Sequence, residues 1–131
     1  MIRSSLTHHF EYNNIDSLLK VFEQYKNQVA AVIMEPMGTT WPVKNFLEQV
    51  KEITHQNGAL FVFDETITGF RFALGGAQEY FGVTPDLSTF GKGMGNGYAI
   101  SALVGKKEYM ELMKDVFLSS TFGGETLSLA A

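Results

Sequence analysis

The sequence predicts an α/β protein in which helices on both faces cover a mostly parallel sheet that has one antiparallel strand. Two short runs, residues 30–34 and 59–63, are apolar at every position and lie on either side of a segment with helical periodicity. Such runs suit strands that are buried on both faces, as in parallel sheets. A third and a fourth β-prone segment follow with too few residues between them for a crossover helix, so that pair is expected to be antiparallel.

The first helix is predicted after an extended lead-in. Apolar side chains recur there at helical spacing: Leu18, Leu19, Phe22 and Tyr25. This periodicity predicts a helix over 16–27, and either Asn14 or Asp16 can cap its N-terminus. The first apolar run then ends at Glu35-Pro36, because proline has no N–H to donate to a strand ladder.

The second helix connects the two apolar runs. Its periodic residues are Phe46, Leu47, Val50 and Ile53. Asn57-Gly58 is expected to end this helix, since glycine favours the conformation that follows a helix C-terminus. The strand over 59–63 comes directly afterwards and leads into Asp64-Glu65. A strand, a helix and a strand in this order predict a parallel crossover.

The second half of the chain predicts shorter elements. A short helix is expected over 75–81, strands over 87–90 and 100–104, and a helix over 107–114. The chain stops within a further helical pattern near Leu127, with no capping residue at its end. We therefore expect this sequence to be a segment of a longer protein.

Length and composition bound the function. With 131 residues, of which 45% are hydrophobic and 18% charged, the chain is expected to form one globular domain. Its net charge of -4 argues against nucleic acid or an anionic membrane as a partner, because both attract basic proteins. It has no cysteine for a disulfide or a thiolate zinc site, no metal site is expected, and no apolar run is long enough to cross a membrane. The expected location is cytoplasmic.

Polar side chains follow three of the predicted strands at their carboxyl ends. Glu35 follows the first strand, Asp64 and Glu65 follow the second, and Lys92 follows the third within the segment Ser88–Gly97. In open α/β sheets this edge binds ligands, although a lone lysine between glycines is more often an ordinary surface charge. The coincidence of three strand ends favours a site.

The chemistry of these residues suits one cofactor. Asp64 follows five apolar residues, so its carboxylate is partly desolvated and suits a cationic partner such as a protonated ring nitrogen. Lys92 can offer an amine to a carbonyl group. The hydroxyl side chains of residues 119–121 precede a helix whose N–H groups can hold a phosphate. An amine, a carboxylate and a phosphate site are what pyridoxal 5′-phosphate requires.

The same strand permits a second interpretation. Leu60–Glu65 ends in an acidic pair after an apolar run, as does the magnesium-binding strand of ATPases, the Walker B strand. Those proteins also need a Gly-x-x-x-x-Gly-Lys-Ser/Thr loop, whereas Lys92 is followed by Gly93 and lies after the acidic strand. A nucleotide-binding protein is therefore the remote alternative.

Four segments occur in a specific order along the chain. They are Glu35-Pro36, Gly58 through Arg71 with Asp64-Glu65-Thr66, Pro85-Asp86-Leu87 leading into Gly91-Lys92-Gly93, and Ser120-Thr121-Phe122-Gly123-Gly124. Together they resemble the class III aminotransferases, which are fold-type-I enzymes dependent on pyridoxal phosphate. Gly69-Phe70-Arg71 followed by Leu74-Gly75-Gly76-Ala77-Gln78 is typical of the branch similar to glutamate-1-semialdehyde aminomutase. The resemblance implies that residues 1–131 are part of the cofactor-binding large domain, without the small domain.

The resemblance also implies a role for each site residue. Lys92 would form the Schiff base with the cofactor and carry protons, and Asp64 would pair with the pyridinium nitrogen. Thr66 would pack on the cofactor ring, where the family usually has valine, and Thr121 would bind the cofactor phosphate of the neighbouring subunit. Glu35 is structural as readily as functional. The intact enzyme would be a homodimer with active sites at its interface. It would transfer an amino group from a small-molecule donor to a carbonyl acceptor through a lysine-bound aldimine, as a transaminase or an aminomutase.

Two positions depart from the family's usual residues. Ile67 stands where many members have a glutamine, although the aminomutase branch tends to be apolar there. Glu125-Thr126 replaces the Asn-Pro of the aminomutases, which points to relatives that act on other amino compounds. A second hypothesis, for the 131-residue chain by itself, is a catalytically inactive fragment that binds cofactor only with missing segments or partner chains.

Overall fold

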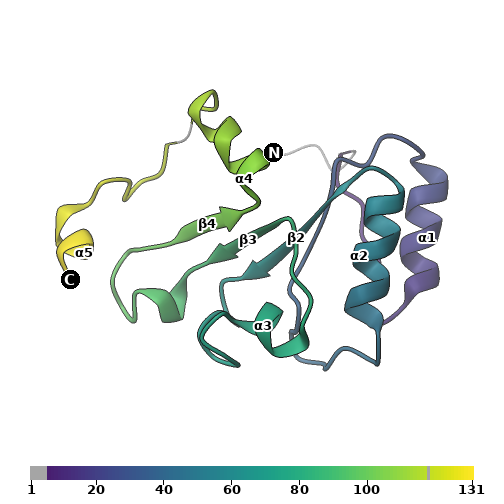
Figure 1. Cartoon of the computed structure of the whole chain (residues 1–131), viewed down its shortest axis with the longest axis horizontal. Helices are drawn as coiled ribbons and strands as arrows, with labels where there is room; N and C mark the ends of the chain where they lie inside the picture. Colours follow the sequence, from purple (N-terminus) through teal and green to yellow (C-terminus); the bar gives the residue numbers. More distant parts are fainter. Residues whose placement is uncertain (1–5, 118) are drawn as a thin grey trace.

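A four-stranded sheet lies at the centre of the computed structural model, which describes residues 6–117 and 119–131 (Figure 1). Its strands are β1 (Ala31–Met34), β2 (Leu60–Glu65), β3 (Leu87–Phe90) and β4 (Ala102–Gly105), in the order β1-β2-β3-β4. The first three strands run parallel, and β4 runs antiparallel to β3. The predicted mostly parallel sheet with one antiparallel strand is therefore confirmed.

The helices connect and flank these strands. They are α1 (Ile15–Gln24), α2 (Phe46–Gln56), α3 (Ala77–Phe81), α4 (Lys107–Met110), which continues as a 3₁₀ helix over Glu111–Lys114, and α5 (Thr126–Ala130). The first helix ends at Gln24, before the predicted residue 27, because Tyr25 leaves the helical conformation with φ of -116° and ψ of 43°, and Asn27 then adopts a left-handed φ of 60°. None of the described helices is both long and apolar enough to cross a bilayer.

Capping residues set the ends of α1 and α2. The Asn14 side chain accepts the Ser17 N–H at 3.1 Å, which identifies Asn14 as the residue that caps α1. The end of α2 lies at Asn57-Gly58, where Gly58 has φ of 72°, a conformation that glycine adopts without steric cost. Both ends agree with the capping residues that the sequence predicts.

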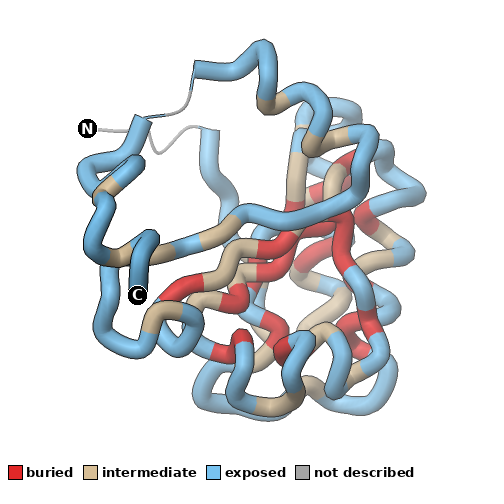
Figure 2. Tube along the Cα trace, turned by 60° about the vertical axis from the view of Figure 1, so that its left-hand side comes forward, coloured by how far each residue is buried: buried red, intermediate tan, exposed pale blue. Residues whose placement is uncertain are grey.

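The hydrophobic core lies between one face of the sheet and the helices α1 and α2 (Figures 1 and 2). Alternate residues of β1 and β2 point into it, since successive side chains of a strand face opposite sides. The buried residues of this core are Leu18, Phe22, Val32, Met34, Phe46, Leu47, Val50, Ala59, Phe61, Phe63 and Val83. This layer holds β1 and β2 in place and so determines where their carboxyl ends lie.

The opposite face of the sheet is only partly covered. Ile33 leaves 66% of its surface exposed and Leu103 leaves 38%. The prediction that the first strand is buried on both faces is thus wrong at Ile33, because α1, α2 and α3 all contact the other face. Helices on this second face stay a prediction.

A buried carboxylate joins several elements at the start of β3. Asp86 is 1% exposed, and it accepts hydrogen bonds from the Phe61 N–H of β2 at 2.8 Å and from the Lys106 ammonium at 2.6 Å. The Nε2 atom of His55, in α2, lies 2.8 Å from the same carboxylate. Burial alone would raise the pKa of Asp86, but the hydrogen bonds from Lys106, Phe61 and His55 outweigh it and hold that pKa below its usual range. Asp86 therefore stays ionised and ties α2, β2 and the segment after β4 together.

Candidate active site

The carboxyl ends of β2 and β3 bring the acidic pair and the lysine to one edge of the sheet. Asp64 pairs in register with Thr89, and Glu65 pairs with Phe90. The lysine loop, residues 91–97, therefore starts where β2 ends. Because the two strands are parallel, Asp64 and Lys92 share the edge at which open α/β sheets bind ligands.

Asp64 is an ionised carboxylate held by neighbouring hydroxyl and N–H groups. Its Oδ1 atom accepts the Thr66 N–H at 3.0 Å and the Thr89 hydroxyl at 3.1 Å. The Thr66 side chain lowers the pKa of Asp64 most and partial burial opposes it, while the Thr66 N–H, Thr89 and the charge of Lys92 lower it further. The hydrogen bonds from the Thr66 N–H and the Thr89 hydroxyl both end on Oδ1.

Lys92 lies on the surface at the start of a 3₁₀ turn, Lys92–Met94. Its backbone φ is 37°, in the left-handed region that a residue with a Cβ rarely adopts. The carbonyl of Lys92 accepts the Asn96 N–H at 3.0 Å, which closes the loop behind it. Unusual backbone conformations of this kind cluster at functional sites. The amine is thus exposed on a backbone whose shape the loop determines.

Residues 66–70 pack against the lysine loop. A methyl group added to Gly91 would lie 3.3 Å from Cγ2 of Thr66, and one added to Gly93 would lie 3.4 Å from the Gly69 carbonyl oxygen. The glycines therefore allow a close approach of the two loops. Thr66 therefore lies beside the lysine loop.

The two other acidic residues of this edge lie outside the surroundings of the lysine. Glu35 is exposed after the end of β1. Glu65 points to the face of the sheet opposite Asp64, where it is fully buried and accepts hydrogen bonds from the start of α3. Sequence reasoning misses this contact, because the donors are backbone N–H groups that come 12 and 13 residues later.

Thr121 stands apart from the other predicted site residues. It is exposed in the turn that precedes α5. Within the described part of the chain, no hydrogen bond joins it to Asp64, Thr66 or Lys92. Its predicted contact with a cofactor phosphate stays a prediction.

The N-terminus of α5 is already capped by the chain itself. The Glu125 carboxylate accepts the N–H groups of Leu127 at 2.8 Å and Ser128 at 2.7 Å. Hydrogen bonds from the Ser128 side chain and from these two N–H groups lower the pKa of Glu125, so it stays ionised. The Glu125 carboxylate therefore occupies two N–H groups at the start of this helix, and the phosphate site expected there stays a prediction. Glu125, which departs from the family's usual residue, has a structural role as this cap.

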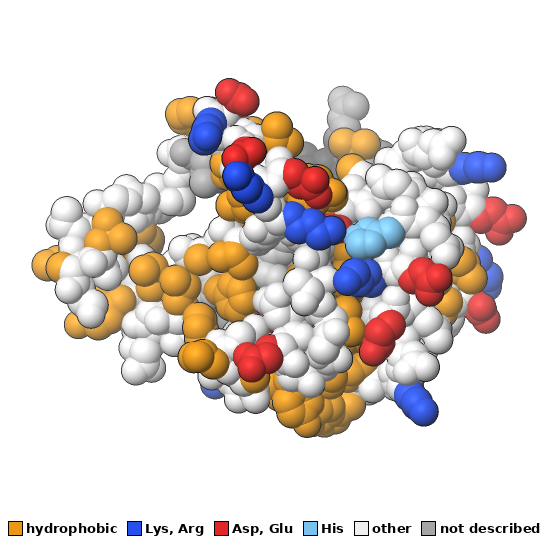
Figure 3. Space-filling view, viewed as in Figure 1, with side chains coloured by type: hydrophobic (Ala, Val, Ile, Leu, Met, Phe, Trp, Pro, Cys, Tyr) orange, Lys and Arg blue, Asp and Glu red, His pale blue; other side chains and the backbone are white. Residues whose placement is uncertain are grey.

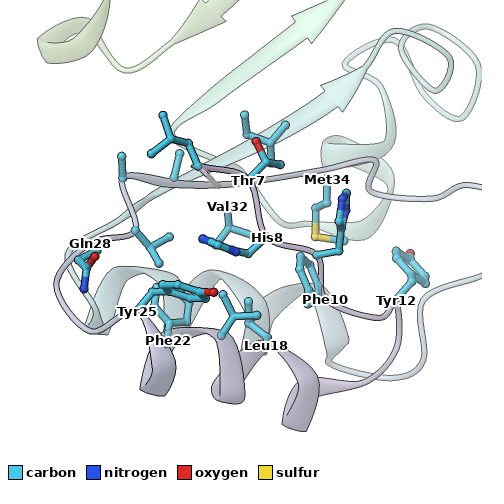
Figure 4. A pocket seen from close by; sticks show the side chains of 17 residues that line it. Thr7, His8, Phe10, Tyr12, Leu18, Phe22, Tyr25, Gln28, Val32 and Met34 are labelled. Carbon is cyan, nitrogen blue, oxygen red and sulfur yellow. The ribbon is translucent and has the colours of Figure 1, made fainter. Parts of the chain in front are cut away.

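A cavity of about 650 Å³ lies away from this edge, between residues 6–12, α1 and β1 (Figure 4). His8 stacks on Tyr25 there, with 3.6 Å between the ring centroids. The lining includes none of the four predicted site residues. The cavity therefore takes no part in the candidate site.

The residues at the sheet edge fit a ligand that has a protonated ring nitrogen and a carbonyl carbon. The ionised Asp64 can accept a hydrogen bond from such a ring, and Lys92 supplies an amine. This set of groups agrees with pyridoxal phosphate.

Comparison with known sequences assigns the chain to a family. Residues 3–131 match the family described as Aminotransferase class-III. The chain is 52% identical to the glutamate-1-semialdehyde 2,1-aminomutase of Alkaliphilus oremlandii, over 92% of this chain and 30% of that protein. It is 53% identical to the 3-aminobutyryl-CoA aminotransferase of Cloacimonas acidaminovorans, over 86% of this chain and 29% of that protein. The chain thus spans about 30% of the length of the curated relatives it matches.

Solved structures agree with this assignment. The PLP internal aldimine form of the FumI protein from Sphingopyxis sp. MTA144 is similar with a TM-score of 0.79 and 30% identity, over 88% of this chain and 29% of that one. An omega-transaminase from Sphaerobacter thermophilus is similar with a TM-score of 0.76 and 33% identity, over 85% of this chain and 27% of that one. Sequence and fold agree, and the chain belongs to the class III aminotransferases.

Proposed function

We propose that this chain is part of the cofactor-binding large domain of an enzyme that binds pyridoxal 5′-phosphate and moves an amino group from a small-molecule donor to a carbonyl acceptor. The observation that carries the proposal is that an ionised carboxylate, Asp64, and a lysine, Lys92, lie at the same edge of a parallel sheet. Two relatives of nearly equal identity are named an aminomutase and an aminotransferase, so transfer within one molecule and transfer between two molecules both fit.

Each residue has a distinct task in this proposal. When bound, pyridoxal phosphate supplies a ring that accepts electrons from the substrate carbon beside the amino group. Asp64 keeps the ring nitrogen protonated, because an ionised carboxylate next to it opposes loss of that proton. Lys92 holds the cofactor through its Nζ atom and, once free, moves a proton to and from the substrate carbon. The Thr66 methyl group would pack on the ring, and its position next to Gly91 supports this role.

Chemical mapping of the cofactor tests the proposal. The full-length protein that contains this segment is loaded with pyridoxal phosphate and reduced with borohydride. We expect peptide mapping to find the cofactor attached to Lys92, because its exposed amine lies at the same sheet edge as Asp64. Attachment at another lysine, or at none, would contradict the proposal.

Replacing Asp64 by asparagine is expected to lower kcat by roughly 10²- to 10³-fold, because a neutral amide cannot stabilise the charged ring nitrogen. Asparagine keeps an oxygen for the Thr66 N–H and the Thr89 hydroxyl, so the fold should be unchanged. Steady-state kinetics measure the loss. Asp16→Asn, on the exposed side of α1, is the matched control. A kcat for Asp64→Asn equal to that of the control would exclude the proposed role.

We also propose that the enzyme is a homodimer whose active sites lie at the subunit interface. Apolar side chains around the site are exposed: Ile67, Phe70 and Leu74. Figure 3 shows further hydrophobic side chains gathered over α3 and over the part of the molecule near α5. Exposed apolar patches of this kind mark interaction surfaces. Thr121, which lacks a hydrogen bond to the other site residues, would then serve the partner's site.

Mixed dimers test this arrangement. In a dimer of one Lys92→Ala subunit and one Thr121→Ala subunit, one site loses both residues and the other site keeps both, provided that Thr121 serves the partner. We therefore expect the mixture to be more active than either homodimer alone, as assay of the mixed subunits will measure. Activity equal to the average of the two homodimers would show that Thr121 serves its own subunit.

A second candidate concerns the 131-residue chain on its own, which we propose to be inactive without further segments or partner chains. The exposed Ile33 and Leu103 on the second face of the sheet favour this candidate, because mostly parallel sheets are normally covered on both faces. Turnover by the isolated chain would contradict it and leave the first proposal standing. A cytoplasmic location, expected from the sequence, stays a prediction.

A further inference from the structure

Glu65 is a buried carboxylate for which the amino-transfer chemistry proposed above has no use. It follows Asp64 directly in β2, but successive side chains of a strand point to opposite faces. Glu65 is 0% exposed, and no ion pair among the described residues includes it. A charged side chain is rarely buried to this extent unless strong partners hold it.

Three hydrogen bonds hold this carboxylate in place. Its Oε2 atom accepts the Thr68 hydroxyl and the Ala77 N–H, both at 2.7 Å, and its Oε1 atom accepts the Gln78 N–H at 2.8 Å. Glu65 therefore binds the loop of residues 66–76 near its start and at its end. An amide cannot replace this carboxylate without loss, because each oxygen accepts a backbone N–H and an NH₂ group would oppose one of them.

Gly76 leaves room for the same carboxylate, because it has no side chain. Its φ is 82°, and a methyl group added there would lie 2.5 Å from Oε2 of Glu65. Alanine at this position would therefore strain the backbone and push the carboxylate away from its partners. The net charge would be unchanged. Gly76 thus offers a second way to disturb the same contact.

The loop that Glu65 holds is the one that meets the lysine loop. The Gly69 N–H donates to the backbone carbonyl of Glu65 at 2.8 Å. A methyl group on Gly91 would lie 3.3 Å from Cγ2 of Thr66, and one on Gly93 would lie 3.4 Å from the Gly69 carbonyl oxygen. A shift of residues 66–70 would therefore be transmitted to the two glycines that flank the lysine.

We infer that Glu65 is a positioning residue: it holds the loop that follows β2 and thereby holds Lys92 where the cofactor binds. This inference rests on the proposed function, because the position of the lysine matters only if it carries the cofactor. Within the acidic pair, Asp64 would bind the ring nitrogen of the cofactor, and Glu65 would hold the loop that follows β2.

Two variants of the full-length enzyme, Glu65→Gln and Gly76→Ala, test this inference. Glu79→Gln is the matched control. Glu79 is an exposed carboxylate that accepts the Gly75 N–H at 2.6 Å in the same loop, and glutamine keeps an acceptor there. All three variants therefore alter a contact to one loop, but only the first two release its buried anchor.

Hydrogen exchange of the cofactor-free protein measures how the Glu65 contact affects the lysine loop, and it does not depend on cofactor binding or catalysis. The N–H groups of Met94 and Asn96 donate within that loop, at 2.9 and 3.0 Å. We expect both to exchange about tenfold faster in Glu65→Gln and Gly76→Ala than in the control, while the amides of α1 and α2 keep their rates. Faster exchange confined to residues 66–76, with the lysine loop as in the wild type, would overturn the inference.

The loaded enzyme provides a second measurement. Occupancy determines the visible absorbance of the cofactor, whereas its orientation determines the visible circular dichroism per bound cofactor. We expect this dichroism to fall about twofold and kcat about 10- to 100-fold in both variants, because small misplacements of a reacting group are costly. Unchanged dichroism per cofactor would also overturn the inference. Failure to find cofactor on Lys92 in the wild type would overturn the proposed function instead, and the exchange experiment would still decide whether Glu65 acts on the lysine loop.

Discussion

Replacing Lys92 by alanine in the full-length enzyme is expected to abolish amino transfer, with a loss of kcat on the order of 10⁴-fold or more. Alanine removes both the amine that holds the cofactor and the group that moves the proton. The fold should be unaffected, because the side chain is exposed and lies outside the hydrophobic core. Turnover assays and the visible absorbance of protein incubated with pyridoxal phosphate measure the two losses.

Two companion variants separate the chemistry of the amine from its charge. Arginine at this position stays protonated and cannot bond to a carbonyl carbon, so Lys92→Arg should be as inactive as Lys92→Ala. Lys107→Ala removes an exposed lysine of α4 whose ion pair with Glu111 spans 3.7 Å, and it should keep wild-type activity. If Lys92→Arg stayed active, the lysine would be an ordinary surface charge.

Replacing Asp86 by alanine is expected to lower the free energy of unfolding by about 3 kcal/mol. The change leaves the buried Phe61 N–H without an acceptor and removes the partner of Lys106 and His55. Lys106→Ala should cost only about 1 kcal/mol, because 48% of that side chain is exposed and water replaces much of the interaction. Urea unfolding measures both losses. Equal losses would show that Asp86 does no more than form the ion pair.

Acid should reduce the advantage of the wild type over Asp86→Asn. The pKa of Asp86 is lower in the folded protein than the usual value of about 3.9 for an unfolded chain. Its ionised form therefore stabilises the fold above that pH, and this stabilisation disappears as the pH falls through the folded pKa. The difference in unfolding free energy between the two proteins should be largest near neutral pH and shrink below about pH 4. A difference that stays constant into acid would contradict the ionised state of Asp86.

Local patterns predict most of the sheet. The apolar run of β2, the Pro85-Asp86 turn before β3 and the short connection to β4 are enough to predict three parallel strands and one antiparallel strand. The same kind of pattern predicts that Ile33 is buried, and there it is wrong. An apolar run shows that both faces of a strand are suited to burial, but it does not show whether a second layer of helices covers the strand.

The site is predictable where residues follow neighbouring strands, and much less so where partners are distant in the sequence. Asp64 and Lys92 end two adjacent parallel strands, so their proximity follows from the order of the sheet. Glu65 and Asp86 carry no such signal, because all their partners except Thr68 lie 12 to 31 residues away and are partly backbone N–H groups, which every residue has. A carboxylate inside or directly before a buried strand is the one feature of the sequence that points to such anchors.

The two ends of β3 have different tasks, although the strand has only four residues. Asp86, just before it, anchors the core, and Lys92, two residues after it, belongs to the proposed site; by the rise of an extended chain they are roughly 20 Å apart. Substitutions that are this far apart and share no partners usually have additive effects on stability. Laboratory evolution toward new substrates can therefore begin with stabilising substitutions around Asp86 and then vary the lysine loop. The free energy of unfolding gained near Asp86 offsets the losses that substitutions in the lysine loop cause.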